Sequence, residues 1–278
     1  MLLRYKNYLQ MNSPFGLLVF LCALFSYQHV NAQAERYEFG IQGGVCNYWG
    51  DLSPKVVLKE THATGGVFAR INFNSSMAWK NELNVYQVSG TDKNFAFNAG
   101  RNLSFSSQIN EFSSVIEFNF FKYGPYVLDK KFTTYFYAGL SGFMFNPQTR
   151  LNGQTYDLID YKTENVAYSR ISMAVPFGMG IKWMVSKNFA LEWQFGLRRT
   201  FTDYLDDVST VYPDIAARFN DGGLIGATLT DRSIETNGTP QNKMGYRRGN
   251  PDYKDWYMSS TISCAFRLNS KVKCGRFY

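Results

Sequence analysis

The sequence is short of charge, histidine and cysteine, and each shortage narrows the classes of protein that it can encode. Only 18% of the 278 residues are charged, which is low for a water-soluble domain. Two histidines, His29 and His62, are too few for a site with several histidine ligands. No Cys-x-x-Cys pair occurs among the four cysteines, which argues against a zinc ribbon or a thioredoxin-like site. No apolar run reaches the roughly 18 residues that a membrane helix needs.

Aromatic residues are abundant instead, at 17% of the chain, although the mean hydropathy is only -0.28. In the stretch 189–198, apolar residues such as Leu191 and Trp193 alternate strictly with others that include Glu192 and Arg198. A period of two places the two sets on opposite faces of a strand. In a transmembrane barrel the apolar face meets lipid and the polar face lines the lumen. The pattern recurs along the chain, and it indicates such a barrel.

The recurring pattern predicts an all-β fold, a membrane-spanning antiparallel β-barrel of about eight strands with long extracellular loops. Short turns alternate with long loops along the chain. Short turns belong on the periplasmic side of such barrels, so both termini are expected on that side too. Pro147 is expected to end the fifth strand, because proline cannot donate to a ladder. The expected strands cover residues 37–45, 65–73, 78–88, a segment reaching 120, 133–145, 168–183, the stretch beginning at 189, and 256–268.

The N-terminus has the pattern of a secretory signal peptide. Arg4 and Lys6 precede an apolar run, and small residues follow at Ala32 and Ala34. We expect cleavage after residue 32, with 34 as the alternative end, a barrel with its loops over 33–268, and a periplasmic tail over 269–278. Cleavage leaves a net charge of about +5, which suits a surface near anionic lipopolysaccharide. The basic residues form no clustered stripe, so nucleic acid is not an expected partner.

Charged residues on the expected lumenal faces predict a network inside the barrel. An eight-stranded barrel is only wide enough for its own side chains, so we expect a plugged barrel rather than a pore. Pro176, Gly178 and Gly180 lie on the inward side of the sixth strand and indicate a bulge or a close backbone approach. The residues assigned to the lumenal network are Arg70, Lys80, Glu82, Glu117, Lys182, Glu192 and Arg198.

An acidic turn follows the strand that begins at residue 189, and its distinctive residues are Asp203, Tyr204, Asp206 and Asp207. We interpret it as a structural motif of an outer loop, with a helical turn over 204–208 whose carboxylates cap it and pair with Arg198 or Arg199. Calcium binding through carboxylate oxygens is the alternative, although the turn lacks the spacing of an EF-hand. No cofactor is expected.

His62 is the one histidine that remains after cleavage, so a serine hydrolase site would have to use it. No motif places a serine or an acid beside it, and we expect a solvated loop histidine and no enzymatic activity. Aromatic residues near strand ends are expected to form interfacial girdles. They are Tyr48, Trp49, Trp79, Trp183 and Trp256. Cys46, Cys264 and Cys274 also survive cleavage, and their pairing stays open apart from at least one unpaired thiol.

Five segments together resemble one family in the right order along the chain. They are EFGIQGGVCNYWGDL at 38–52, YFYAGLSGFMFNP at 135–147, PFGMGIKW at 176–183, RRTFTDYLDDVST at 198–210 and RGNPDYKDWY at 248–257. The chain resembles the PorG-like outer-membrane proteins of type IX secretion. The resemblance implies a non-enzymatic structural component of protein secretion and gliding motility. It also implies association with a periplasmic ring of a PorK-like lipoprotein and a PorN-like partner.

The tail after residue 268 is the expected partner-binding element, since it is basic, ends in aromatics and adds no strand. Its candidate residues are Lys271, Lys273, Arg276, Phe277 and Tyr278. A disordered terminus is the alternative for the tail. For the whole chain, the alternative is a stand-alone small outer-membrane barrel that acts as an adhesin or a narrow porin through its outer loops.

Overall fold

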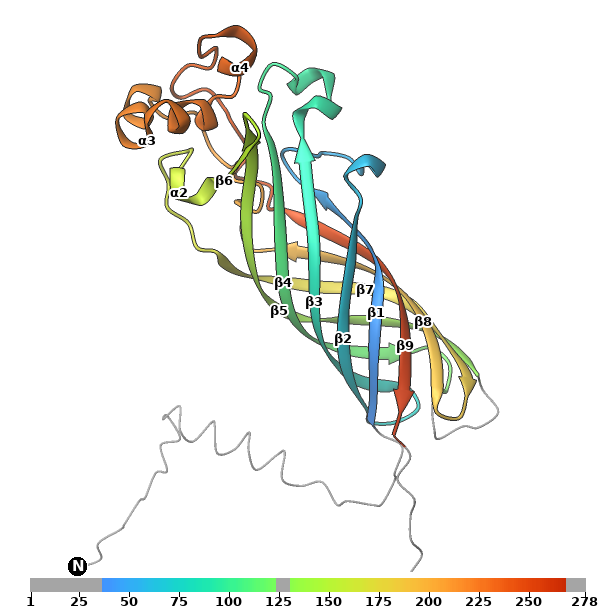
Figure 1. The fold of residues 1–278 in the computed structure, drawn as a ribbon. Helices are drawn as coiled ribbons and strands as arrows, with labels where there is room; N and C mark the ends of the chain where they lie inside the picture. The colour runs from blue at the N-terminus through green and yellow to red at the C-terminus, as the bar shows by residue number, and fades with distance from the viewer. Residues whose placement is uncertain (1–36, 124–130, 269–278) are drawn as a thin grey trace, which may run out of the picture. The chain divides into compact units, whose positions relative to one another are not determined.

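The structure is a computed structural model that describes residues 37–123 and 131–268 (Figure 1). The expected signal peptide, with either end at 32 or 34, lies outside the described residues. So does the tail 269–278, with its candidate residues Lys271, Lys273, Arg276, Phe277 and Tyr278, and so does Cys274.

Eight antiparallel strands close into a barrel, in the order β1-β2-β3-β4-β5-β7-β8-β9 and back to β1. Their bounds are β1 (Tyr37–Trp49), β2 (His62–Asn72), β3 (Met77–Thr91), β4 (Ser104–Asn119), β5 (Phe132–Leu151), β7 (Ile171–Ser186), β8 (Phe189–Thr200) and β9 (Trp256–Arg267). Each strand pairs with its neighbours in sequence, and β1 closes the ring against β9. The predicted antiparallel barrel of eight strands is therefore confirmed.

The outer wall of the barrel is apolar around its whole circumference. Ile41 on β1, Ile171 on β7 and Ile262 on β9 are 60%, 63% and 64% exposed, and large apolar side chains on the other strands are similarly exposed. The intervening residues on each strand are buried, which is the alternation seen in the sequence. An apolar belt of this extent marks a membrane surface rather than a water-facing one.

Short turns join strands at one end of the barrel, which we call the turn end, and long segments join them at the other, the loop end. The turn end holds the connections 73–76 and 187–188. At the loop end lie β6 (Gln154–Asp157), α2 (Leu158–Tyr161), α3 (Ile215–Thr230) and α4 (Ile234–Asn237), with three short 3-10 helices, η1 (Leu58–Glu60), η2 (Asp92–Asn94) and η3 (Ala96–Asn98) (Figure 1). Within the described residues, none of the helices combines the length and the apolar character needed to cross a membrane.

The expected end of the fifth strand at Pro147 is wrong, because β5 continues to Leu151. Pro147 pairs with Ser107 of β4 on one side. On its other side β7 last pairs with Met144, and β6 first pairs with Gln148. The ring of proline therefore sits where the strand has a locally free edge, so no ladder bond is lost.

The expected helical turn over 204–208 is also wrong, since this segment consists of bends without helix. The helix of the same long segment is α3, which begins after its N-cap Asp214. Asp214 accepts a hydrogen bond from the amide of Ala216, and Gly223, with a φ of 64°, kinks the helix at its middle. The paired glycines Gly222 and Gly223 mark this kink rather than an unstructured loop.

Candidate functional site

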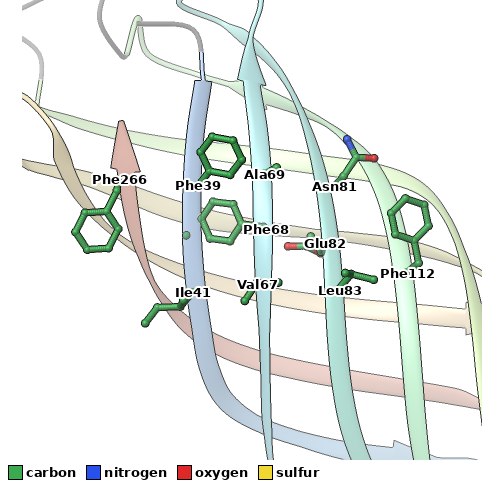
Figure 2. A pocket seen from close by; sticks show the side chains of 11 residues that line it. Phe39, Ile41, Val67, Phe68, Ala69, Asn81, Glu82, Leu83, Phe112 and Phe266 are labelled. Carbon is green, nitrogen blue, oxygen red and sulfur yellow. The ribbon is translucent and has the colours of Figure 1, made fainter. Parts of the chain in front are cut away.

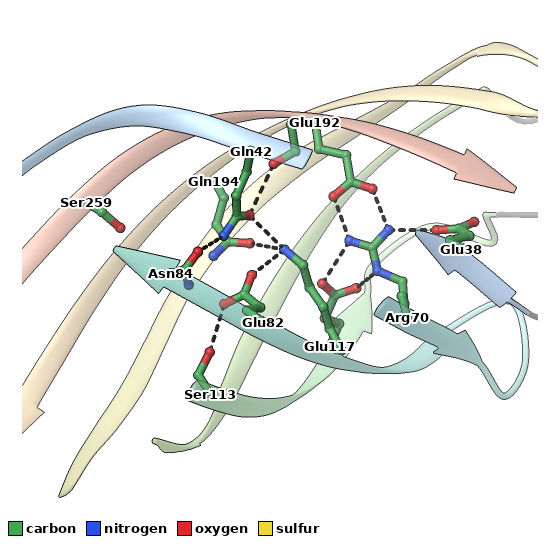
Figure 3. A network of polar contacts seen from close by, with 12 residues as sticks. Glu38, Gln42, Arg70, Glu82, Asn84, Ser113, Glu117, Glu192, Gln194 and Ser259 are labelled. Carbon is green, nitrogen blue, oxygen red and sulfur yellow. Dashed lines mark hydrogen bonds and ion pairs between the residues drawn. The ribbon is translucent and has the colours of Figure 1, made fainter. Parts of the chain in front are cut away.

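Arg70 is the hub of the lumen at the turn end, where it meets three carboxylates from three other strands (Figure 3). Its two terminal nitrogens bind both oxygens of Glu192, at 2.5 and 2.6 Å. They also contact Glu38 at 2.7 Å and Glu117 at 3.1 Å. All four side chains are buried, and the bidentate geometry with Glu192 is the strongest form that such a pair takes.

Strand register brings these groups together. Glu38 lies directly opposite Arg70 across β1 and β2, and Lys182 lies opposite Glu192 across β7 and β8. Each has the inward parity of its strand, so the alternation aims it into the lumen. Lys182 donates to Glu117, and its ammonium also lies 4.3 Å from the ring centre of Tyr135.

A second layer lies further toward the loop end, around Lys80. Its ammonium pairs with Glu82 at 2.5 Å and donates to Gln194 at 3.0 Å. The same ammonium stands 4.2 Å from the centre of the Phe68 ring, an inward-facing aromatic that covers the cation. Ser113 donates to Glu82 and completes the layer (Figure 3).

The third layer is built on Arg198. Its guanidinium contacts Glu111 at 3.4 Å and Ser259 at 2.6 Å, and it donates to the Tyr86 hydroxyl at 2.5 Å. The Tyr257 hydroxyl donates to the other oxygen of Glu111 at 2.6 Å. The hydroxyls of Tyr86 and Tyr257 thus link the Arg198–Glu111 ion pair to strands β3 and β9.

The three layers balance in charge. The inward-facing charged residues of the described strands are five cations and five carboxylates: Arg70, Lys80, Lys182, Arg198 and Arg267, with Glu38, Glu82, Glu111, Glu117 and Glu192. Every one of them is paired with an opposite charge. A buried charge is tolerated only when it is paired and hydrogen-bonded, and this arrangement meets that condition.

Tyrosine rings fill the lumen beside β7, next to the inward-facing glycines of that strand. A Cβ on Gly180 would lie 2.6 Å from the Tyr135 ring, and one on Gly178 would lie 2.9 Å from the Tyr137 ring. A real Cβ does not approach other atoms so closely, so only glycine fits. The predicted close approach is present, and the irregularity in pairing lies elsewhere, between Met184 and Ser186.

At the loop end the lumen is closed by loops that converge on Tyr48. Its hydroxyl lies 2.7 Å from Asp206 and 2.6 Å from Asp255, and all three side chains are buried. Tyr48 was expected in an interfacial girdle, but it is fully buried, because its place on β1 has inward parity. We call Tyr48, Asp206 and Asp255 the mouth cluster.

A hydroxyl has one proton, so Tyr48 can donate to only one of its two carboxyl neighbours. Asp206 accepts from the amides of Leu52 and Val208, one at each oxygen, as a carboxylate does. Asp255 accepts from the amide of Leu205 at Oδ2, and its Oδ1 contacts Tyr48. This inventory assigns a proton to Oδ1 of Asp255, which donates it to Tyr48, while Tyr48 donates to Asp206.

Burial raises the pKa of both Asp206 and Asp255 well above the usual range, which favours a proton on this pair. Nearby carboxyls raise the two pKa values further: Asp255 and Asp51 act on Asp206, and Asp203 and Asp51 act on Asp255. Burial also raises the pKa of Asp203 to about 7 and that of Asp207 to about 6. Arg248 opposes the shift at Asp207, and Glu164 and Asp51 add to the negative charge nearby. At the loop end, burial thus shifts the pKa of these carboxyl groups upward, toward their protonated forms.

Arg248 ties the neighbouring loops together beside the mouth cluster. It pairs with Glu164 at 3.0 Å and with Asp207 at 3.5 Å. Glu164 in turn accepts from the amides of Ser209 and Thr210, at 2.9 and 2.8 Å. These contacts fasten the segment before β7 to the acidic turn and to the segment before β9.

The acidic turn lies in this closed mouth, and its three carboxylates have different partners. Asp203 accepts from Ser209, Asp206 from Tyr48, and Asp207 from Thr163 and from Tyr168. The expected pairing with Arg198 or Arg199 is wrong, since Arg198 belongs to the lumen and pairs with Glu111. Tyr204 stacks on Tyr168 with ring centres 4.6 Å apart.

Separate partners for these carboxylates leave no shared centre for a cation. Among the residues that the structure describes, no group of three or more His, Cys, Asp or Glu side chains could hold a metal ion. Leu205, between Asp203 and Asp206, and Val208, directly after Asp207, are buried in the apolar cluster under the loops. The geometry of the turn is that of a structural plug.

His62 has neighbours that the sequence did not reveal. Its Nε2 lies 2.7 Å from the hydroxyl of Ser89, which also bonds to Glu60, and Asn94 donates to Glu60 at 2.9 Å. The expected solvated loop histidine is therefore wrong, because His62 begins β2 and contacts Ser89 of β3, next to Glu60 of η1. In a catalytic triad the acid orients the histidine ring. Here Glu60 binds the serine instead, so the order of contacts is not that of a triad.

The closed antiparallel ring, the apolar belt and the ion-paired lumen together define a β-barrel of the outer-membrane type with a filled interior. The chain belongs to the family described as "Domain of unknown function (DUF6089)", whose model matches residues 16–217. A comparison with curated proteins found no match.

Three solved structures of small outer-membrane proteins are similar to this chain, all at low identity. Ail, the attachment invasion locus protein of Yersinia pestis, is 8% identical over 85% of this chain and 100% of its own, with a TM-score of 0.42. Neisserial surface protein A is 7% identical over 84% and 97%, with a TM-score of 0.40. OprG from Pseudomonas aeruginosa is 7% identical over 85% and 98%, with a TM-score of 0.38.

Proposed function

We propose that this chain is a non-enzymatic structural barrel of the outer membrane that seals its own lumen and serves as an anchor for protein partners. The observation that carries the proposal is the closure of the barrel. Balanced ion pairs fill the lumen, and loops joined by hydrogen bonds cover its mouth. A barrel closed in this way is suited to holding a surface in the membrane rather than to passing solutes.

The assembly that we propose it serves is type IX protein secretion, with gliding motility as a related role. Support comes from the resemblance of five segments to PorG-like proteins, since the family model itself names no function. In this proposal the turn end and both termini face the periplasm, because short turns belong on that side of such barrels. The partners are then a PorK-like lipoprotein and a PorN-like protein, and lipid and lipopolysaccharide surround the barrel.

The tail 269–278 is the proposed point of contact, through its basic residues and its terminal aromatics. The test is to delete residues 269–278, verify by heat-modified mobility that the barrel still inserts, and compare affinity recovery of periplasmic proteins with that of the full chain. Loss of the ring proteins would support the proposal. Unchanged recovery would move the contact to another surface, and no ring proteins with either chain would contradict the secretion role.

A stand-alone adhesin is the second candidate, and one observation favours it. Large apolar side chains are exposed on the loop-end segments, among them Leu224, Met244 and Tyr253, at 67%, 73% and 74%. Exposed apolar residues outside the membrane belt suit contact with another surface. Replacing these three residues by serine should abolish surface adhesion if the adhesin role is correct, and should leave secretion unchanged. A narrow porin is disfavoured by the filled lumen.

A further inference from the structure

The apolar belt carries a polar carboxamide near its centre, on β3. The outward-facing residues of this strand from Met77 to Val85 form its share of the belt, and Asn81 is the middle one. Its neighbours in the two adjacent strands are small, Ala69 on β2 and Ser114 on β4. Ser114 accepts a hydrogen bond from the indole of Trp79, at 2.8 Å.

The carboxamide of Asn81 has no hydrogen-bond partner among the residues that the structure describes. By contrast, the indoles of Trp79 on the same strand and of Trp193 on β8 each donate to a serine. Acyl chains offer no donor or acceptor, so lipid leaves this amide unsatisfied. Polar side chains on a membrane-facing surface therefore tend to bond to a neighbouring membrane segment.

Asn81 lies beside a groove of about 470 Å³ in the outer wall (Figure 2). Figure 2 shows Phe39 and Phe266 on one side of the groove, Ala69 near its middle, and Phe112 on the other side beyond Asn81. Apolar residues line most of the groove, and its polar lining residues are Asn81 and Glu82. Phe112 projects from β4 and is 52% exposed, so the wall carries a hollow over β2 and a knob on β4.

We propose that this wall is the interface between two copies of the chain, related by a two-fold axis that passes near Asn81 along the membrane normal. A carboxamide both donates and accepts, so two copies of Asn81 facing each other satisfy one another by reciprocal hydrogen bonds. The same rotation places β4 of one copy opposite β2 of the other, so that the knob at Phe112 meets the hollow over β2. One surface thus supplies both halves of the contact, which is what a two-fold dimer requires.

The test uses the full-length chain in outer membranes, with Asn81→Cys and oxidative cross-linking by copper phenanthroline. A disulfide-linked band of twice the chain's mass is expected, because residues near the axis face their own copies. Phe195→Cys is the matched control, since β8 lies diametrically opposite β3 in the ring and residue 195 also faces outward. The unmodified chain controls for the native cysteines.

A second variant separates a polar contact from simple proximity. Asn81→Leu should raise the dimer dissociation constant about tenfold in detergent sedimentation, and Asn81→Gln should restore association. Leucine on an outward face does not threaten folding, because the flanking residues of the strand are already apolar. The proposal is overturned by equal cross-linking at 81 and 195, by a cross-link to a protein of different mass, or by unchanged association of the leucine variant.

Discussion

The lumen within the membrane belt and the mouth at the loop end are both rich in buried charge, but they neutralise it in different ways. In the lumen, strand residues bring five cations to five carboxylates. In the mouth, carboxyls outnumber cations, and Asp206 and Asp255 share one tyrosine hydroxyl. The lumen neutralises its buried charge by ion pairs, whereas the mouth does so partly by protonation of its carboxyl groups. The difference teaches that rigid register can match charges in pairs, whereas loops that converge from distant parts of the chain rely on hydrogen bonds.

The largest expected effect comes from removing the hub of the lumen. Arg70→Met leaves three buried carboxylates without their common partner, and such a loss costs on the order of 3–5 kcal/mol. The measurement is the urea midpoint of refolded protein, followed by heat-modified mobility. Arg199→Met is the control, because this side chain faces outward over Trp256 and should cost less than about 1 kcal/mol. Equal effects from the two substitutions would refute the ion-paired lumen.

A smaller effect is expected when both members of one lumenal pair are removed together. Lys80→Met alone leaves Glu82 buried and unpaired, whereas Lys80→Met with Glu82→Leu leaves no charge behind. The double variant should therefore be more stable than the single one, by about 1–3 kcal/mol on the urea scale. A double variant less stable than Lys80→Met would mean that the pair is not the reason for the loss.

Arg248→Met tests the mouth in the same way, and a milder result is expected there. Burial already raises the pKa of Asp207 to about 6, so this carboxyl can take up a proton when its cation is removed. We expect a local loss of about 1–2 kcal/mol, confined to the loops that Arg248 joins. Hydrogen exchange of the amides of Ser209 and Thr210 should quicken while that of β3 stays slow. A global loss as large as that of Arg70→Met would erase the contrast between the two regions.

The smallest effect is a pH dependence confined to the mouth. The pKa of Asp203 is raised to about 7 and that of Asp207 to about 6, from about 3.9 in an unfolded chain. The folded mouth therefore binds more protons than the unfolded one, so its stability falls as pH rises from about 4 through 7. Hydrogen exchange of Leu205 and Val208, corrected for intrinsic rates, should be less protected at pH 8 than at pH 5.

Asp255→Asn makes the pH test sharper. The asparagine side chain carries an N–H group at every pH, in place of the proton assigned to the Asp255 carboxyl. The amide nitrogen can donate to Tyr48 while the amide oxygen accepts from Leu205, so the contacts survive. The variant should remove the contribution of Asp255 to the pH dependence at Leu205, leave that of Asp203 and Asp207, and keep the protection at pH 5. An unaltered pH profile would place the shared proton elsewhere.

The alternation of single strands was enough to predict the barrel and the inward side of each lumenal residue. A period of two reports the face of a residue directly, and this is why Arg70, Glu117 and Glu192 point where the sequence indicates. The pairings were harder to predict, because they depend on register and stagger around the ring. The alternation also puts Glu38, Glu111 and Arg267 on inward faces, but no local pattern shows that Glu111 pairs with Arg198 and Glu38 with Arg267.

The contacts of the mouth could not be predicted from alternation, because they join residues that lie far apart in the chain. Tyr48 reaches Asp206 and Asp255 across 158 and 207 positions. The inward parity of Tyr48 was visible in the sequence, but aromatic residues near strand ends suggested a girdle. His62 and Ser89 likewise meet across the paired strands β2 and β3, and η1 adds Glu60 beside them. Loop packing of this kind leaves no periodic signal.

Single-channel recording in planar bilayers tests the central claim, that lumen and mouth together seal the barrel, most directly. Refolded full-length protein should give no stable open-channel current, because ion pairs and tyrosine rings fill the lumen and loops close its mouth. Arg70→Met with Arg198→Met, if it still inserts, should introduce brief, noisy openings. Large and steady conductance of the unmodified protein, at the same inserted amount, would contradict the account.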